Sequence, residues 1–255
     1  MKQNQENRED EFSIWMREFY NKKAKNLSEK GYEHGRWFSS KEKRKQYEFS
    51  RVSLLHHLKN LNFKNCLEIG CGPGTWTKFL LDKFPDSKID CLDISKEMIS
   101  QHKNNVKSKR VKRIVSNFLL YNTNKKYDFI FFSRSIEYIP NKDAVIKKMS
   151  ELMKHNAKGV IITSPPHPLI LFIKRFFGKK INKNHTQRID INSMRNLLLK
   201  YNLRDVRFYP ILFSDFRLVP TSLLFNKFYK KPWGLISKMF ATGYFAVFTK
   251  NGSQI

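Results

Sequence analysis

The stretch LEIGCGPGTW, Leu67–Trp76, decides the fold of this chain. A short apolar run leads into three glycines at alternate positions and then into an amphipathic segment, which predicts a strand, a tight turn and a helix. A dinucleotide-binding turn would carry its third glycine three positions after the second. Thr75 occupies that position, whereas Gly74 follows Gly72 by two. Because glycine lets a ligand lie against bare backbone, the loop is predicted to hold a ligand, but not a dinucleotide.

Strand and helix patterns alternate beyond this loop. Short apolar runs typical of buried strands are separated by amphipathic segments typical of helices. The expected strands are 66–70, 87–95, 110–118, 127–133 and 158–164. After a last helix, the runs 203–213 and 243–250 are expected to pair as terminal strands. We therefore predict an α/β fold: a Rossmann-like, doubly wound sheet of about seven strands, mostly parallel with an antiparallel C-terminal strand.

The chain of 255 residues is predicted to form a single domain, since no low-complexity linker divides it. Its expected parts are an N-terminal helical cap (1–61), a ligand-binding core (62–165), a variable lid insertion (166–190), and a C-terminal helix and strand pair with a basic aromatic insertion (191–255). In the cap, one buried helical stripe is expected at Phe49, Val52, Leu55 and Leu58.

The cellular compartment of the protein is indicated by features that the sequence lacks. The N-terminus has no apolar signal-peptide core, and no window of about eighteen apolar residues is present. Cys66, Cys71 and Cys91 have no metal-type spacing and are expected to be reduced thiols. We expect a cytoplasmic protein without a metal site. Peripheral association with the inner face of the membrane stays open.

The formal net charge of +27 is the most unusual feature of the composition. Nucleic acid, an anionic membrane and acidic substrates are all partners that such a charge favours. An A/T-rich coding composition also raises the lysine content, and the basic residues are spread along the chain. The charge alone therefore does not choose a partner.

Two acidic residues restrict the class of ligand that the glycine loop can bind. Glu68 stands directly before the loop, where a carboxylate would repel a pyrophosphate and suit a positive charge. Asp93 ends the next expected strand, where a carboxylate can accept hydrogen bonds from ribose hydroxyls. The pair favours a nucleoside with a cationic, phosphate-free tail, and S-adenosylmethionine is such a ligand.

The order of these motifs resembles a known family. LEIGCGPG, CLDIS, YDFIFFSRSIEYI and GVIITSPP follow one another as in the class I S-adenosylmethionine-dependent methyltransferases. The chain is most similar to the group acting on small molecules, lipids, quinones and glycans, the methyltransferase type 11/12-like proteins. The resemblance implies S-adenosylmethionine as cofactor and a Rossmann-like fold.

The resemblance also implies which positions hold the cofactor. In the family, the loop glycines line the methionine part, the acid contacts ribose, the next residue packs on adenine, and the end of the third strand reads the adenine edge. Ser133 and its neighbour Arg134 end the fourth strand, beside the reacting methyl group. The cofactor-binding residues implied in this way are Glu68, Gly70, Cys71, Gly72, Gly74, Asp93, Ile94, Asn117, Phe118 and Ser133. Asn117 replaces an acid usual in the family, but its oxygen can still accept a hydrogen bond.

Catalysis of methyl transfer needs alignment of the acceptor and, for a hydroxyl acceptor, a general base. His185, in the lid, is one candidate for that base or for a substrate contact. Glu137 and Tyr138 are further candidates, because many relatives carry Glu-His there. In the cap, His34, Tyr32 and Trp37 are candidates for a lid over the cofactor.

Two basic, aromatic stretches lie outside these motifs. SPPHPLILFIKRFFGKK, 164–180, follows the fifth strand, so it is not the Pro-Pro catalytic loop of base-amine methylation, which follows the fourth. Its double proline ends the strand, and the remainder, like 223–240, predicts a short basic amphipathic helix. Such helices suit an anionic membrane or an apolar substrate; packing on the sheet is the alternative.

The expected function is transfer of a methyl group to an O (or N or C) acceptor on a small molecule, an apolar, lipid-linked, quinone or glycan intermediate. Methylation of tRNA or rRNA is the first alternative, suggested by the charge, but the fourth strand ends in FSRS rather than in an Asn/Asp-Pro-Pro-aromatic loop. A non-catalytic binding protein of the same fold is the second. The acceptor and the oligomeric state stay open.

Overall fold

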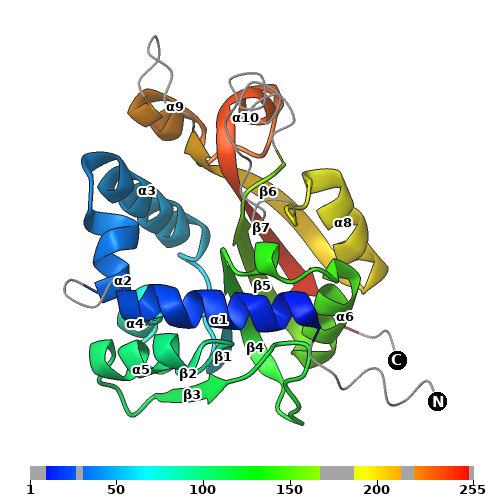
Figure 1. Cartoon of the computed structure of the whole chain (residues 1–255). Coiled ribbons are helices and arrows are strands. Elements are labelled where there is room, and N and C mark those ends of the chain that lie inside the picture. Colours follow the sequence, from blue (N-terminus) through cyan, green and yellow to red (C-terminus); the bar gives the residue numbers. More distant parts are fainter. Residues whose placement is uncertain (1–9, 27–30, 167–186, 214–220, 253–255) are drawn as a thin grey trace.

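The computed structural model describes residues 10–26, 31–166, 187–213 and 221–252 (Figure 1). The helices are α1 (Glu11–Asn26), α2 (Gly31–Glu33), α3 (Lys41–His57), α4 (Thr75–Lys83), α5 (Lys96–Asn105), α6 (Lys142–Leu152), α8 (Ile191–Lys200), α9 (Thr221–Phe228) and α10 (Leu235–Phe240). The strands are β1 (Asn65–Ile69), β2 (Lys88–Asp93), β3 (Val111–Val115), β4 (Tyr127–Ser133), β5 (Met153–Thr163), β6 (Leu203–Phe213) and β7 (Ala241–Lys250). A π-helical turn, His34–Phe38, follows α2, and a 3-10 turn, Ile136–Tyr138, follows β4.

The strands form one seven-stranded sheet in the order β3-β2-β1-β4-β5-β7-β6. The first five strands are parallel to one another, and β7 runs antiparallel to both β5 and β6. The predicted fold class and the pairing of the terminal strands are confirmed. From β1, the chain builds outward first through β2 and β3 and then, on the other side, through β4 and β5. Such a reversal leaves a crevice at the carboxyl ends of the strands, where α/β proteins bind ligands.

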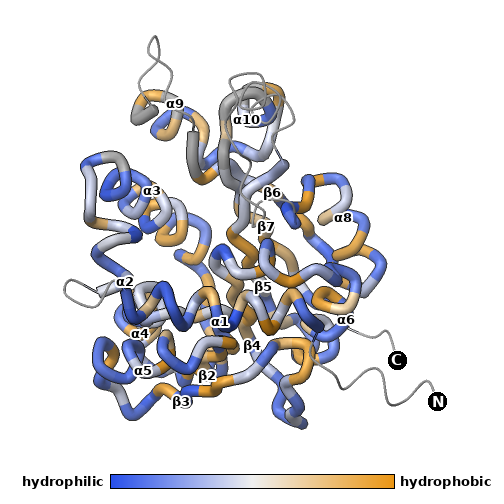
Figure 2. Tube along the Cα trace, in the orientation of Figure 1, coloured by the Kyte–Doolittle hydropathy of each residue, from blue (hydrophilic) through white to orange (hydrophobic). Residues whose placement is uncertain are grey.

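Side chains alternate along the central strands and build a core on each face of the sheet. On β4, Phe129 and Phe131 join a cluster with Leu54 of α3 and Leu80 of α4. The alternate residues of the strand, such as Ile130, pack instead into the cluster that holds residues of α6 and α8. The helices accordingly lie on opposite sides of the sheet (Figure 1), and the most hydrophobic parts of the trace lie along the central strands (Figure 2). Burial on both faces explains why these strands read as continuous apolar runs.

The N-terminal helix α1 is tied to the edge of the sheet through α5. Ser95, which caps α5 by accepting from the backbone N–H of Met98 at 3.1 Å, also donates its hydroxyl to Asn21 Oδ1 of α1 at 2.7 Å. Ala24 of α1 packs with Met98. In Figure 1, α1 passes in front of β1 and β4. The cap is thus held over the ligand-binding edge of the sheet.

The stripe predicted for α3 is wrong in one position. Val52 is 37% exposed, whereas Leu54 is fully buried. The helix has neighbours on two sides: Tyr47 stacks on Trp76 of α4, with ring centroids 5.7 Å apart, and Phe49 stacks on Phe225 of α9 at 4.1 Å. Two contact faces leave Val52 between them, and a single apolar stripe cannot anticipate this arrangement.

None of the helices in the described part of the chain is long and apolar enough to cross a membrane.

Candidate functional site

A cavity lies at the carboxyl ends of β1, β2, β3 and β4, where the strand order reverses. Its floor consists of residues that end these strands or directly follow them, and its roof comes from α1, α2 and the π-helical turn. Residues near the beginning of the chain, such as Ser13, therefore line the same cavity as residues more than a hundred positions further on, such as Ile139. The predicted cofactor residues that line this cavity are Gly70, Cys71, Gly72, Asp93, Ile94, Asn117, Phe118 and Ser133.

Each of the three positions in the loop requires glycine for a different structural reason. Gly70 has φ +70°, and a Cβ there would lie 2.2 Å from the Cβ of Ser135. Gly72 has φ +52°, and a Cβ there would meet nothing within 4 Å. Gly74 begins α4 with φ +100°, and a Cβ would lie 2.5 Å from Val106 Cγ2. Gly74 therefore serves packing and does not line the cavity, whereas Gly72 leaves bare backbone in it.

Asp93 holds the loop in place and offers acceptors to the cavity. Its Oδ2 accepts from the backbone N–H of Gly72 and its Oδ1 from that of Ser95, both at 2.9 Å. The side chain is 8% exposed, and burial raises the pKa of this carboxyl against the lowering effect of its backbone hydrogen bonds. Each oxygen has further lone-pair capacity, so the carboxyl can accept from two ligand hydroxyls.

The neighbouring strand ends supply amide and aromatic groups. Asn117 Oδ1 accepts from the backbone N–H of Leu119 at 3.0 Å, which fixes the side chain and leaves the amide nitrogen as donor. Phe118 is buried and meets Phe132 edge-on, with ring centroids 5.4 Å apart. An apolar wall with a few fixed polar groups is typical of a nucleoside pocket.

Glu68 lies beneath the loop and does not line the cavity, which differs from the expectation of a charge beside the ligand. The side chain is 1% exposed, and its Oε2 accepts from Thr77 Oγ1 at 2.6 Å. Burial raises the pKa of Glu68 to about 8. At neutral pH this carboxyl mainly keeps its proton, so it contributes structure under the loop rather than negative charge.

Beneath the loop, donor and acceptor can be assigned for each hydrogen bond in a chain that leads from Arg113 to Glu68. Arg113 Nε donates to His102 Nδ1 at 3.1 Å, and burial lowers the pKa of His102 to about 4, so the ring is neutral at pH 7. His102 Nε2 must then carry the proton and donate to Thr77 Oγ1, 2.9 Å away, which in turn donates to Glu68. Both ring nitrogens of His102 are thus occupied.

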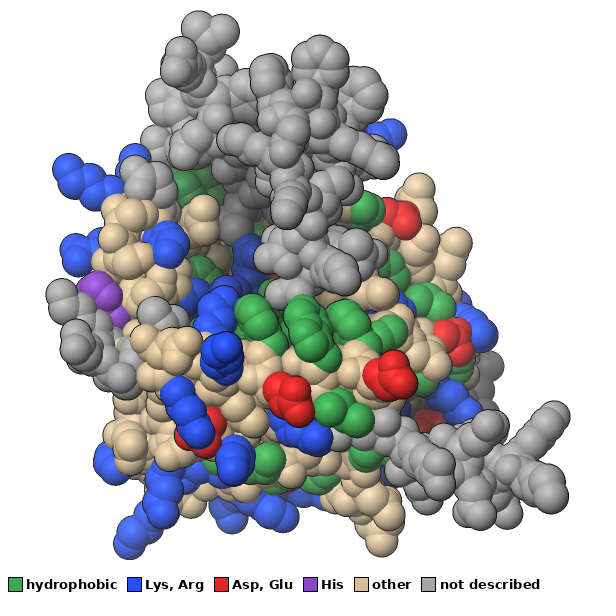
Figure 3. Space-filling view, viewed as in Figure 1, with side chains coloured by type: hydrophobic (Ala, Val, Ile, Leu, Met, Phe, Trp, Pro, Cys, Tyr) green, Lys and Arg blue, Asp and Glu red, His purple; other side chains and the backbone are tan. Residues whose placement is uncertain are grey.

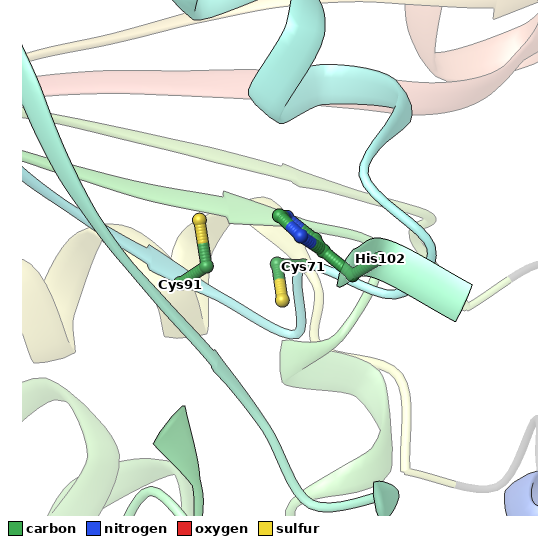
Figure 4. A group of neighbouring side chains, drawn as sticks. All are labelled: Cys71, Cys91 and His102. Carbon is green, nitrogen blue, oxygen red and sulfur yellow. The ribbon is translucent and has the colours of Figure 1, made fainter. Parts of the chain in front are cut away.

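Cys71, Cys91 and His102 lie close together beneath the loop (Figure 4), with their possible metal-ligand atoms all within 4.8 Å of one another. Both His102 nitrogens already have protein partners, and burial raises the pKa of the Cys71 and Cys91 thiols. Metal binding needs deprotonated thiols and a free imidazole lone pair. These three residues are therefore poorly suited to bind a metal ion, and the two cysteines are buried, protonated thiols.

The proton on Glu68 leads to a prediction about stability and pH. The folded chain holds this proton more tightly than the unfolded chain, in which the pKa is near 4.5. The stability from this group is therefore complete below pH 4.5 and is lost as the pH rises toward 8. Glu68→Gln keeps an acceptor for Thr77 but cannot ionise. As the pH rises from 6 to 8, we expect the free energy of unfolding of the wild type to fall by about 2 kcal/mol more than that of the variant.

Urea denaturation at pH 6, 7 and 8 measures this difference. Glu33 titrates in the same window, since burial raises its pKa to about 7, and it is present in both proteins; its charge also raises the pKa of Glu68. Glu97→Gln, on a partly exposed carboxylate of α5 that pairs with Lys25, is the matched control. Parallel pH profiles for Glu68→Gln and the wild type would contradict the assignment of a protonated Glu68.

The roof of the cavity is aromatic. Tyr20 lies between Tyr32 and Tyr138, with ring centroids 6.5 and 5.5 Å away. Burial raises the pKa of Tyr20 and of Tyr32, so both phenols stay neutral. Trp37 also lines the cavity, whereas His34 does not. Tyr32 and Trp37, candidates from the sequence, are thus placed at the cavity, while Tyr20 had no sequence signal.

Of the three catalytic candidates, the structure describes Glu137 and Tyr138. Tyr138 lines the cavity, and Glu137 is buried beside it without lining it, its Oε2 3.9 Å from Arg188 Nε. His185 lies outside the described residues. No histidine is found among the described residues that line the cavity. Glu33, Arg36 and Arg134 do line it; the first two come from the cap, where no motif pointed to them.

Comparisons with known proteins agree with this geometry. Residues 67–158 match a family model described as a methyltransferase domain. The malonyl-[acyl-carrier protein] O-methyltransferase 2 of Ilyobacter polytropus is 41% identical over 101 residues, 39% of this chain and 38% of that protein. The malonyl-[acyl-carrier protein] O-methyltransferase of Priestia megaterium is 33% identical over 109 residues, 40% of each chain.

Among solved structures, the magnesium protoporphyrin IX methyltransferase of Synechocystis PCC 6803 with bound SAH superposes with a TM-score of 0.65. The superposition covers 93% of this chain and 99% of that one, at 12% identity, so this likeness concerns the fold alone. The curated relatives are matched over about two fifths of their length. The region that the family model matches contains the glycine loop, Asp93 and the fourth strand.

Proposed function

The chain belongs to the class I S-adenosylmethionine-dependent methyltransferases, and from this premise we propose that it transfers a methyl group to an oxygen acceptor on a small molecule of a lipid pathway. The observation that carries the proposal is the cavity at the strand ends. There the bare backbone of Gly72, the carboxyl of Asp93 and the wall at Phe118 lie together inside the region that the family model matches.

The residues present fit this cofactor. A Cβ at Gly72 would meet nothing within 4 Å, so the loop leaves space against the main chain. Gly70, Cys71 and Gly72 would hold the methionine part, Asp93 the ribose, and Ile94, Asn117 and Phe118 the adenine. When bound, the cofactor supplies a methyl group that its sulfonium makes electrophilic. Glu68 and Gly74 support the loop from below.

The contribution of the protein is then to bind, orient and exclude water. Tyr20, Tyr32 and Trp37 close the cavity from the cap side. Tyr138, on the 3-10 turn after β4, is the residue proposed to contact the acceptor. Glu137 is proposed to act indirectly, through its ion pair with Arg188. His185 stays a proposal for a lid contact.

The acceptor is proposed from the relatives and the lining of the cavity. The relatives named malonyl-[acyl-carrier protein] O-methyltransferases suggest an oxygen acceptor on an acyl-type molecule. The apolar, aromatic lining favours an acceptor with an apolar part. RNA methylation and a purely binding role find no support in the site or in the comparisons.

Two measurements test the proposal in sequence. Calorimetry with S-adenosylmethionine comes first, and absence of binding would overturn the enzymatic assignment. The protein is then incubated with methyl-labelled cofactor and with lipid, glycan, RNA and small-metabolite fractions of a cell extract. We expect label in the lipid or small-metabolite fraction; label confined to RNA would replace the proposed acceptor class.

Peripheral contact with an anionic membrane is proposed for the described part of the second basic stretch. Leu223 on α9 and Leu235 on α10 are 60% and 73% exposed, and Lys227, Lys230 and Lys238 are exposed on the same segment. Figure 3 shows a further gathering of hydrophobic side chains over α1. Along that helix, Phe12, Trp15 and Phe19 follow one another with ring centroids 5.7 and 5.5 Å apart. Exposed apolar groups among lysines are typical of interfacial binding.

Flotation with liposomes tests this contact. We expect the protein to float with vesicles containing anionic lipid and not with neutral ones, and the double variant Leu223→Ser, Leu235→Ser to float several-fold less. The first stretch, 167–180, lies outside the described residues. Sedimentation of the wild type away from anionic vesicles would remove the membrane proposal.

A further inference from the structure

We propose that the acceptor end of the cavity is an oxyanion-binding site, in which Arg134 together with Arg36 holds a carboxylate or phosphate group of the acceptor. The inference rests on the proposed function and deepens it: the acceptor would be an acid with an apolar part, not a neutral lipid, quinone or sugar.

Arg134 is the first observation. It directly follows β4, lines the cavity, and has φ +54°, a backbone conformation rare for a residue with a side chain. Its Nη1 reaches Ser164 Oγ at 3.4 Å, a long hydrogen bond. Its Nη2 is buried and has no hydrogen-bond partner among the described residues. A buried guanidinium donor without a partner is costly, so the strain and the orphaned donor indicate a group that arrives with the ligand.

Arg36 is the second observation. It lines the same cavity from the opposite side, on the π-helical turn of the cap, with its guanidinium carbon 5.0 Å from the ring centroid of Trp37. Both arginines line one cavity, and their charges interact: burial lowers the pKa of Arg134, the charge of Glu137 raises it, and the charges of Arg36 and Arg188 lower it. Two elements distant in sequence thus bring two guanidinium groups to one buried place.

The acidic groups around this place do not satisfy Arg134. Glu137 is buried with its Oε2 facing Arg188, and that oxygen forms no hydrogen bond among the described residues. Asp93 is occupied by backbone N–H groups of Gly72 and Ser95. Glu33, beside Arg36, has a pKa raised by burial to about 7, so it carries only part of a charge at neutral pH. Arg134 Nη2 therefore has no carboxylate oxygen as a hydrogen-bond partner among the described residues.

The proposed cofactor adds net positive charge, since it carries a sulfonium and an ammonium group against a single carboxylate. Cations brought together in a buried site repel each other unless an anion lies between them. An acceptor with an acid group supplies that anion, and the planar fork of arginine matches both carboxylate and phosphate. The single carboxylate of the cofactor can pair with one guanidinium group, and a neutral acceptor would leave the other without an anionic partner.

Binding of matched eight-carbon probes tests the inference. Calorimetry is performed on the full chain saturated with S-adenosylhomocysteine, and the probes are octanoate, octyl phosphate and 1-octanol. We expect at least one of the acids to bind ten or more times more tightly than the alcohol. The two acid probes distinguish a carboxylate site from a phosphate site. Equal affinities for all three probes, or no binding of either acid at millimolar concentration, would overturn the inference.

Variants then locate the site. Arg134→Met and Arg36→Met are each expected to reduce the preference for acid over alcohol about tenfold, measured at saturating S-adenosylhomocysteine, whose affinity is determined for each variant. Arg204→Met, on an exposed arginine of β6, is the matched control and should change neither. An unchanged preference in both cavity variants would contradict the assignment. Should a variant fail to fold, the wild-type probe series decides by itself.

Different results would contradict the proposed function and the oxyanion site. No binding of S-adenosylmethionine or S-adenosylhomocysteine would overturn the proposed function. Tight binding of S-adenosylhomocysteine without any preference for an acid would leave that function standing and remove only the oxyanion site.

Discussion

Asp93→Ala is expected to weaken the binding of S-adenosylmethionine about a hundredfold. The carboxyl would accept two hydrogen bonds from the ribose, and hydrogen bonds to a charged group contribute about 1.5–3 kcal/mol each. It also fixes the loop, since Oδ2 accepts from the backbone N–H of Gly72 at 2.9 Å. Its removal therefore costs both the contacts to the ligand and the positioning of the bare backbone. A loss of about 3 kcal/mol corresponds to the expected factor.

Calorimetry with S-adenosylmethionine measures this loss. Asp93→Asn keeps the shape of the side chain but replaces one acceptor oxygen with a donor, so an intermediate loss is expected. Asp86→Ala, on an exposed carboxylate between α4 and β2, is the matched control. An affinity of Asp93→Ala within threefold of the wild type would show that the ribose does not lie at this carboxyl.

Gly70→Ala is expected to destabilise the fold by about 3 kcal/mol or more. The residue has φ +70°, where a Cβ costs about 1–2 kcal/mol. The new Cβ would also lie 2.2 Å from the Cβ of Ser135, whose hydroxyl donates to Ile69 O at 2.7 Å. Relief of such an overlap requires the turn after β4 to move, and overpacking of this kind costs about 1–3 kcal/mol.

Gly72→Ala separates the two contributions. Its φ is +52°, but a Cβ would meet nothing within 4 Å, so we expect a loss of only about 1 kcal/mol in stability together with weaker cofactor binding. Urea denaturation of both variants measures the difference. The double variant Gly70→Ala, Ser135→Gly removes the overlap and should recover part of the loss. Equal stability of Gly70→Ala and Gly72→Ala would contradict the steric explanation.

Much of the ligand-binding edge could be predicted from local patterns. Gly72 and Asp93 were placed at the site because a glycine turn and a strand-terminal acid have recognisable spacing. Glu68 shows where this reasoning ends: the position next to the loop was predicted, but not the direction of its side chain. On a strand, neighbouring residues face opposite sides of the sheet, so Glu68 turns toward Thr77 below the loop while the chain continues into the cavity.

Local sequence patterns are enough to predict the order of strands and helices, the glycine turn and the acid at the end of β2, because these depend on short-range periodicity and backbone geometry. The roof of the cavity depends instead on tertiary packing, which brings Tyr20 and Arg36 of the cap to the cavity that Arg134 and Tyr138 line beyond β4. Their meeting depends on how the cap packs against α5 and the sheet edge, through contacts such as Asn21 with Ser95. No spacing within a local segment encodes such a contact, so the acceptor end of the site emerged only from the folded chain.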